Sequence, residues 1–293
     1  LLEKGFKITG IDNMNNYYDQ KLKKLRISNL RSINFEFKKL DINDLSFLRG
    51  KFDLVINLAA QPGVRVSEKY KKNYEHSNIS GFKRLIDYCL QNNIKKIIYA
   101  SSSSVYDDSS LIPFSEDITI LKPKSLYGET KLFNEKYIDR MNSRLDSIGL
   151  RFFSVYGPFG RPDMAYFSFT RSIKENKLIK LHNNGSMMRD MTFIDDAIDG
   201  IVKSIDLLMN TDSKIDNEKF NIGNDSPIST FELLKTLEKY INIKAQTESF
   251  IALNESRYTH ADLNKSKSFL GYNPKTTFEE GIKEFLSWYK NYE

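Results

Sequence analysis

Tyr127 and Lys131 have the residue types and the spacing that proton-transfer chemistry requires. Residues four positions apart lie on one face of a helix, so the phenol and the ammonium would point the same way. A nearby cation favours the phenolate, and such a tyrosine can act as a general base well below its ordinary pKa of about 10. The alternative is an exposed surface pair, because the chain contains 16 Tyr and is rich in Lys. The residues around the pair must therefore show whether it is a catalytic pair or an exposed surface pair.

A run of four serines, 101–104, follows a strand-like apolar segment upstream of Tyr127. Four hydroxyls at the end of a buried strand can orient a substrate alcohol and relay its proton to a phenolate. The alternative is a polar turn, because serine is common in turns. The run that precedes Val105 contains no Asp or Glu, so the sequence places no carboxylic acid here for a dehydration or a decarboxylation.

Acidic and amide side chains follow two other strand-like segments. Asp12, followed by Asn13, suits the diol of a ribose, as does the acid found about 20 residues after a dinucleotide-binding glycine loop. The glycine loop itself would lie before Leu1. Asp41, followed by Ile42, is a candidate for an adenine edge or simply a polar strand end.

Small residues follow a third strand-like segment, where a cofactor needs close approach to the backbone. This segment ends in Leu58, Ala59 and Ala60. Asn78 is ambiguous, because it suits either a cofactor contact or the N-cap of the helix that follows.

Strand-like and helix-like segments alternate along the first half of the chain. The strand-like segments are 7–12, 35–40, 54–58, 96–100, 150–154 and 220–223. Helical periodicity is found over 78–90, 127–145 and 278–292, and 192–208 reads as a strand end that leads into a helix. Residues 1–5 resemble the last turn of a helix closed by Gly5. This opening predicts that a preceding segment has been lost.

The alternation predicts an α/β fold with a doubly wound parallel sheet, whose ligands bind at the carboxyl ends of the strands. We expect residues 1–155, together with 190–223, to form the dinucleotide-binding domain. Residues 156–189 and 224–293 would form a smaller substrate-binding lobe.

Composition narrows the function classes. The 293 residues are 40% hydrophobic and 13% aromatic, which predicts a buried core and argues against disorder. The net charge of +6 is spread along the chain, so neither nucleic acid nor a membrane is an expected partner. A single cysteine suits the reducing cytoplasm. The three histidines lack ligand spacing, so no metal site is expected.

Three longer segments carry a specific resemblance. They are residues 10–19 (GIDNMNNYYD), 59–67 (AAQPGVRVS) and 156–164 (YGPFGRPDM), and the likeness continues to residues 277–289. On these motifs the chain resembles the extended short-chain dehydrogenase/reductase family, and within it the NAD-dependent nucleotide-sugar 4-epimerases that act on UDP-glucuronate. The resemblance implies a Rossmann-like fold, bound NAD, a UDP-sugar substrate and a homodimer.

The resemblance also implies roles for single residues. Tyr127 would take the proton of the sugar 4-hydroxyl, Lys131 would hold the nicotinamide ribose, and Ser102 would be the catalytic serine with Ser103 as helper. Phe153 joins the cofactor contacts named above. Ser154 and Arg161 match positions near a uronate carboxylate, Arg189 matches a contact to the diphosphate, and Glu255 stands where relatives bind the uridine ribose.

Two alternatives remain open on the sequence. One is a 4-epimerase of neutral UDP-hexoses or N-acetylhexosamines, because Arg161 also fits a surface loop beside Pro162. The other is a non-catalytic protein that binds NAD or a nucleotide sugar, since the expected glycine loop is not among these residues.

Overall fold

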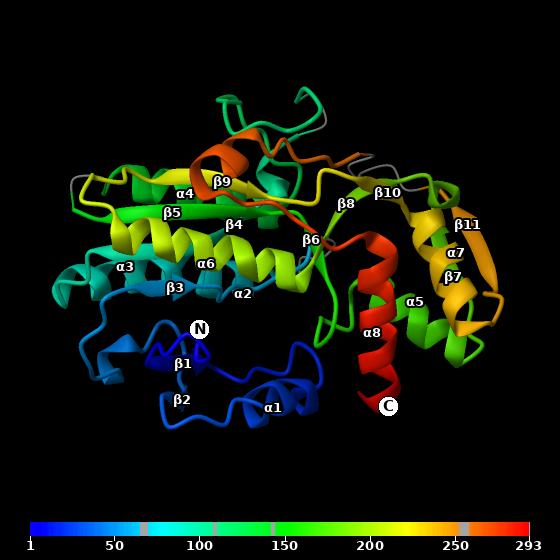
Figure 1. Ribbon diagram of the computed structural model, residues 1–293, viewed down its shortest axis with the longest axis horizontal. Coiled ribbons are helices and arrows are strands. Elements are labelled where there is room, and N and C mark those ends of the chain that lie inside the picture. The colour runs from blue at the N-terminus through cyan, green and yellow to red at the C-terminus, as the bar shows by residue number, and fades with distance from the viewer. Residues whose placement is uncertain (65–69, 108–109, 142–143, 252–257, 293) are drawn as a thin grey trace. The chain divides into compact units, whose positions relative to one another are not determined.

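The computed structural model describes residues 1–64, 70–107, 110–141, 144–251 and 258–292, and its helices and strands alternate through most of that length (Figure 1). The helices are α1 (Gln20–Ser28), α2 (Lys71–Tyr74), α3 (Gly81–Gln91), α4 (Leu126–Asp139), α5 (Ala165–Lys174), α6 (Ile194–Asn210), α7 (Thr230–Ile241) and α8 (Phe278–Tyr292). The strands are β1 (Ile8–Asp12), β2 (Phe35–Lys39), β3 (Val55–Asn57), β4 (Lys96–Ser102), β5 (Asp146–Phe152), β6 (Ser154–Tyr156), β7 (Ile179–His182), β8 (Met188–Phe193), β9 (Glu218–Ile222), β10 (Pro227–Ser229) and β11 (Thr247–Phe250).

The strands of the first half pair in parallel. Strands β1 and β2 form a two-stranded sheet in which Ile8 lies opposite Phe35. A second sheet has the order β3-β4-β5-β9, with Val55 opposite Ile97 in its parallel β3–β4 pair. Parallel strands require crossover connections, which the intervening helices provide. The predicted α/β fold with a parallel sheet is therefore confirmed.

Two compact units divide the chain. The first contains residues 1–105, 125–150 and 204–219, and the second contains 106–124, 151–203 and 220–293. Some of the residues that the sequence analysis assigned to the dinucleotide-binding domain belong to the second unit, namely 106–124, 151–155, 190–203 and 220–223. The functional division into a cofactor domain and a substrate lobe stays a prediction.

Helix α3 shows how the core of the first unit forms. Its residues Phe82, Leu85, Ile86 and Cys89 recur at helical spacing, and all four are buried in one hydrophobic cluster. Tyr99 of β4 packs edge-on against Phe82, with ring centroids 5.6 Å apart. The predicted helix is confirmed, although a π-helical turn over Glu75–Ser80 replaces its first residues.

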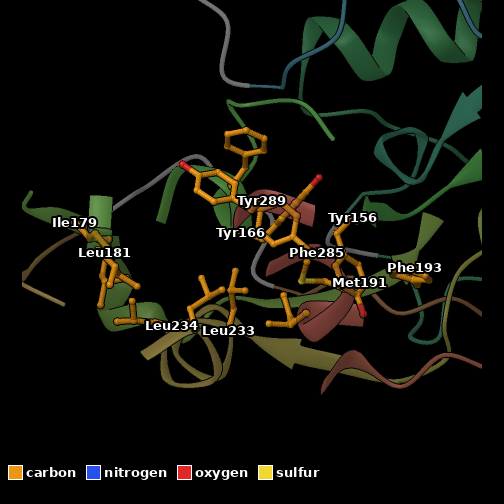
Figure 2. Packing of buried hydrophobic residues seen from close by; sticks show 14 residues of the cluster. Tyr156, Tyr166, Ile179, Leu181, Met191, Phe193, Leu233, Leu234, Phe285 and Tyr289 are labelled. Atoms are coloured by element: carbon orange, nitrogen blue, oxygen red, sulfur yellow. The ribbon is translucent and has the colours of Figure 1, made fainter. Parts of the chain in front are cut away.

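The second unit has a core rich in aromatic residues, built around α5, α7 and α8. Figure 2 shows Tyr166, Phe285 and Tyr289 crowded together, and the rings of Tyr166 and Phe285 meet edge to face at 4.7 Å. Such pairs contribute about 1 kcal/mol beyond the area they bury. Helix α7 begins with a capping box in which Ser229 and Glu232 bond each other's backbone N–H.

The prediction for residues 127–145 was wrong at its C-terminal end. Helix α4 ends at Asp139, and the N–H of Met141 donates to the carbonyl of Ile138 in the turn that follows. Leu145 continues the helical spacing in the sequence, but it is buried immediately before β5. Strand β5 begins at Asp146, four residues before the predicted strand.

Residues 1–6 form the hydrogen-bond pattern of a Schellman motif. The N–H of Phe6 donates to the carbonyl of Leu1, and that of Gly5 donates to the carbonyl of Leu2. Gly5 has φ +81°, the left-handed conformation that this motif requires. The local geometry is therefore that of a helix end.

Candidate functional site

Helix α4 presents Tyr127 and Lys131 from its first two turns. Ser125 caps the helix, because its hydroxyl accepts a hydrogen bond from the N–H of Gly128 at 3.1 Å. The Nζ of Lys131 lies 5.7 Å from the centroid of the Tyr127 ring. The ammonium and the phenol thus share one helix face, as their spacing predicts.

Lys131 is a buried cation. It is 3% exposed, and its Nζ donates to the carbonyl of Ala100 at 2.7 Å. Burial disfavours the charged form and lowers the pKa of Lys131 to about 8. At neutral pH the group is still mostly an ammonium, now held in surroundings where its field is weakly screened.

The contact to Ala100 ties α4 to the end of β4, where the serines lie. Ser101 donates from its hydroxyl to Glu135 of α4 at 2.6 Å. The hydroxyl of Ser102 accepts from the N–H of Ser104 at 3.1 Å, and Ser102 is buried. Ser103 is half-buried and begins a short 3₁₀ turn. The first unit therefore carries all four predicted catalytic residues on α4, the end of β4 and the 3₁₀ turn that follows β4.

Asn78 connects α4 to the loop that follows β3. Its Oδ1 accepts from the N–H of Gln61 at 2.7 Å, and its Nδ2 donates to the Gln61 carbonyl at 3.1 Å and to Thr130 Oγ1 at 2.9 Å. Asn78 is 2% exposed and lies inside the π-helical turn, so it is not the N-cap of α3, which is Ser80. These bonds position the loop carrying Ala59 and Ala60 against the Tyr127 helix.

The small-residue loop after β3 lies partly at the surface. Leu58 and Ala59 are exposed, and Ala60 is half-buried. Asn57 at the end of β3 is buried, and its Oδ1 accepts from the N–H of Ala59 at 3.2 Å, which shapes the turn. Ala59 and Ala60 have only a methyl side chain, so their side chains hinder a ligand little.

Asp12, Asn13 and Asp41 come together at the carboxyl ends of β1 and β2. Asn13 donates from Nδ2 to Asp41 at 2.9 Å, and Asp12 accepts from the N–H of Met14 at 2.6 Å and from Lys23 at 3.2 Å. Burial raises the pKa of Asp41, but hydrogen bonds from Asn13 and Asn43 outweigh it and hold the pKa below its ordinary value. Asp41 is thus suited to accept hydrogen bonds at neutral pH.

Two predicted cofactor residues are buried. Ile42 packs in the hydrophobic cluster of the first unit. Phe153, in the second unit, donates its N–H to the carbonyl of Ile222 at 3.0 Å. Any contact of either side chain with a ligand stays a prediction.

The predicted substrate residues belong to the second unit. Ser154 begins β6 and pairs with Met191 of β8. The Nη1 of Arg161 donates to Asp163 at 2.9 Å, and that of Arg189 donates to the carbonyl of Met188 at 2.7 Å. Glu255 lies outside the described residues.

The sequence analysis missed Asp190, beside Arg189. Asp190 is fully buried and accepts hydrogen bonds from the N–H groups of Asn224, Asp225 and Ala261 at 2.6, 3.2 and 2.9 Å. Burial raises its pKa above the ordinary value. It fixes two loops beside the strand that carries Arg189. An acid directly followed by the strand-forming residues Met-Thr-Phe was the available signal.

The described ranges contain no group of three or more His, Cys, Asp or Glu side chains able to hold a metal ion. None of the helices in these ranges combines the length and the apolar character needed to cross a bilayer.

The sequence of this chain is similar to those of known proteins over most of its length. The model of the NAD dependent epimerase/dehydratase family matches residues 1–223. UDP-glucuronate 4-epimerase 1 of Arabidopsis thaliana is 39% identical, with 100% of this chain and 73% of the plant protein covered. Protein CapI of Staphylococcus aureus is 34% identical, with 100% of this chain and 93% of that protein covered.

A solved structure extends the likeness to three dimensions. The crystal structure of UDP-glucuronic acid 4-epimerase from Bacillus cereus, in complex with UDP-glucuronic acid and NAD, matches with a TM-score of 0.91. It is 31% identical, and the match covers 100% of this chain and 93% of that one. The Rossmann-like fold and the resemblance predicted from the sequence are confirmed. The chain belongs to the NAD dependent epimerase/dehydratase family.

Proposed function

We propose that this protein is an enzyme that interconverts UDP-glucuronate and UDP-galacturonate by inverting C4 of the sugar, with NAD as its cofactor. The observation that carries the proposal is the buried Lys131 beside Tyr127, tied to the serine-bearing end of β4. Relatives that are 39% and 31% identical over the whole chain bear the name of this activity.

The residues of the first unit fit NAD. Carboxylates suited to a ribose diol or an adenine edge lie at two strand ends, and a small-residue loop follows a third. We assign the cofactor to Asp12, Asn13, Asp41, the loop 58–60 and Lys131, and further to Ile42, Asn78 and Phe153. When bound, NAD supplies a hydride acceptor at the sugar C4 and the donor that returns the hydride.

Proton transfer is the work of the chain itself. Tyr127 as phenolate takes the proton of the 4-hydroxyl while the C4 hydride leaves, which gives a 4-keto sugar. Ser102 and Ser103 orient that hydroxyl, and the Lys131 ammonium stabilises the phenolate. After the 4-keto sugar rotates, the hydride returns to its other face and Tyr127 gives the proton back. The net reaction is therefore an isomerisation without net redox change.

Substrate charge selects among UDP-sugars. We assign Arg161 to the uronate carboxylate, because a guanidinium pairs well with a planar carboxylate, and Ser154 to the same group. We assign Arg189 to the diphosphate and Glu255 to the uridine ribose. A 4-epimerase of neutral UDP-hexoses or N-acetylhexosamines is the second candidate. The observation that favours it is the Arg161–Asp163 ion pair, which already supplies this guanidinium with a carboxylate.

We also propose a homodimer in the cytoplasm. Phe133 and Tyr137 stack on α4 with ring centroids 5.7 Å apart and are only half-buried, so they offer apolar surface to a second copy. The single cysteine suits a reducing compartment. Sedimentation would show a mass of twice 34.1 kDa, and a monomer would refute the dimer.

The test is a proton NMR assay of the anomeric signals of UDP-glucuronate incubated with protein and NAD. We expect signals of UDP-galacturonate to appear. The variant Tyr127→Phe should lose about 10²–10⁴-fold in rate, as expected for removal of a general base. The control is Tyr137→Phe, on the same helix but outside the proposed site. Conversion of UDP-glucose while UDP-glucuronate stays unchanged would favour the second candidate, and failure with every sugar would refute both.

A further inference from the structure

The loop 157–164 holds Arg161 in a defined place. Gly157 has φ +137°, a backbone conformation that residues other than glycine rarely adopt. A Cβ on Gly160 would lie 1.5 Å from the Tyr166 hydroxyl, so this position has no room for a side chain. The ring of Phe159 packs on Trp288 of α8 at 5.0 Å. The loop is therefore anchored just before the arginine.

The side chain of Arg161 is itself engaged. Its Nη1 donates to Asp163 Oδ2 at 2.9 Å, and its Nη2 faces the sulfur of Met164 at 3.3 Å. The side chains of Arg161 and Asp163 are 28% and 41% exposed. The Asp163 contact uses one edge of the fork, and a thioether is a weak acceptor at the other. A guanidinium carries five donors, so a second carboxylate can still bind.

Asp163 has opposite consequences for the two kinds of sugar. When a neutral sugar covers Arg161, Asp163 still supplies its counter-charge, and the cost of desolvating an unpaired cation is avoided. When a uronate covers Arg161, its carboxylate shares the guanidinium with Asp163 and is repelled by it. The pair thus favours neutral sugars relative to a lone arginine.

We propose that Asp163 is a specificity-determining residue that weakens the preference of the site for uronates and lets it accept neutral UDP-sugars. The proposal rests on the proposed function, because it takes Arg161 as the residue that meets the sugar carboxylate. Asp163 acts through Arg161 and is a positioning residue.

The test is the ratio of the dissociation constants of UDP-glucose and UDP-glucuronate, measured by calorimetry with NAD present. A Tyr127→Phe background keeps both sugars unconverted. We expect Asp163→Asn to shift this ratio about twofold to fivefold towards UDP-glucuronate, the size expected for one partly exposed charge pair. The shift should shrink as salt is added. The matched control is Glu175→Gln, which removes a carboxylate from another exposed pair two residues apart, Glu175–Lys177, and should leave the ratio unchanged.

The variant Arg161→Gln, made in the same Tyr127→Phe background, distinguishes a failure of this inference from a failure of the proposed function. If Arg161→Gln lowers the ratio and Asp163→Asn raises it only when Arg161 is present, the proposal holds. If Arg161→Gln lowers the ratio while Asp163→Asn leaves it unchanged or lowers it, Asp163 does not set specificity although the uronate assignment stands. If Arg161→Gln has no effect, the assignment of Arg161 in the proposed function fails, and the inference fails with it.

Discussion

Replacing Lys131 by methionine removes a buried charge that the fold tolerates at a cost. We expect Lys131→Met to be more stable than the wild-type protein at pH 7, although it should lose epimerase activity. The side chains have similar volume, so the change removes the ammonium and its hydrogen bond to Ala100 while keeping the packing. The comparison measures what this candidate catalytic group costs in stability.

The magnitude follows from the pKa of Lys131. Its fall from 10.5 to about 8 corresponds to about 3 kcal/mol, at 1.36 kcal/mol per pKa unit. The lost hydrogen bond and the unpaired Ala100 carbonyl offset about 1–2 kcal/mol of this gain. The variant should therefore be about 1–2 kcal/mol more stable at pH 7.

The pH dependence has a defined sign. Between about pH 8 and 10.5 the unfolded chain holds the Lys131 proton while the folded protein has released it. The unfolded state then binds more protons, so the stability of the wild-type protein rises with pH in this window. From pH 7 to pH 9.5 the burial cost falls by about 2 kcal/mol, and the advantage of Lys131→Met should shrink by that amount.

Urea unfolding followed by circular dichroism at both pH values gives the required free energies. Other titrating groups cancel in the difference between variant and wild type. The control is Lys136→Met, an exposed lysine on the same helix, whose effect should not change with pH. A stability difference for Lys131→Met that is the same at pH 7 and pH 9.5 would refute the reasoning.

Two further variants test the scaffold around the site. Asn78→Ala should lower the free energy of unfolding by about 2–4 kcal/mol, because the buried N–H and carbonyl of Gln61 lose their Asn78 partners and Thr130 loses one hydrogen bond. Urea unfolding would measure this, and a change below about 0.5 kcal/mol, typical of surface positions, would contradict it. Gly160→Ala should raise the KM for UDP-glucuronate about tenfold or more, because the loop must move to clear Tyr166 and carries Arg161 with it. Initial rates over a range of substrate concentrations would test this, and an unchanged KM would show that Arg161 does not depend on the loop geometry.

Much of the fold could be predicted from periodicity. The spacing of Phe82, Leu85 and Cys89 predicted α3, and 278–292 was predicted as a helix and is α8. Periodicity failed at Leu145, because an apolar residue at helical spacing is equally able to begin a buried strand. Packing against residues distant in sequence decides whether the helix continues or a strand begins, and the local sequence does not contain that information.

The site was predictable where its residues are close in sequence. Tyr127 and Lys131 are one helical turn apart, so their shared face followed from the spacing. Asn78 was ambiguous because its partners Gln61 and Thr130 lie 17 and 52 residues away. The pairing of Arg161 with Asp163 was missed for a different reason, since residues two apart in a loop have no fixed relation until the backbone is known.

The bonds around Asn78 have a consequence for local unfolding. Its side chain joins the loop after β3 to α4, and its carbonyl accepts from Asn134 of the same helix at 2.7 Å. Opening any one of these segments breaks bonds to the others, so the loop, the π-helical turn and the front of α4 should open as one cooperative unit. Their backbone amides should then exchange with deuterium at a common rate, and the proposed catalytic tyrosine should be protected from or exposed to solvent together with the loop assigned to NAD.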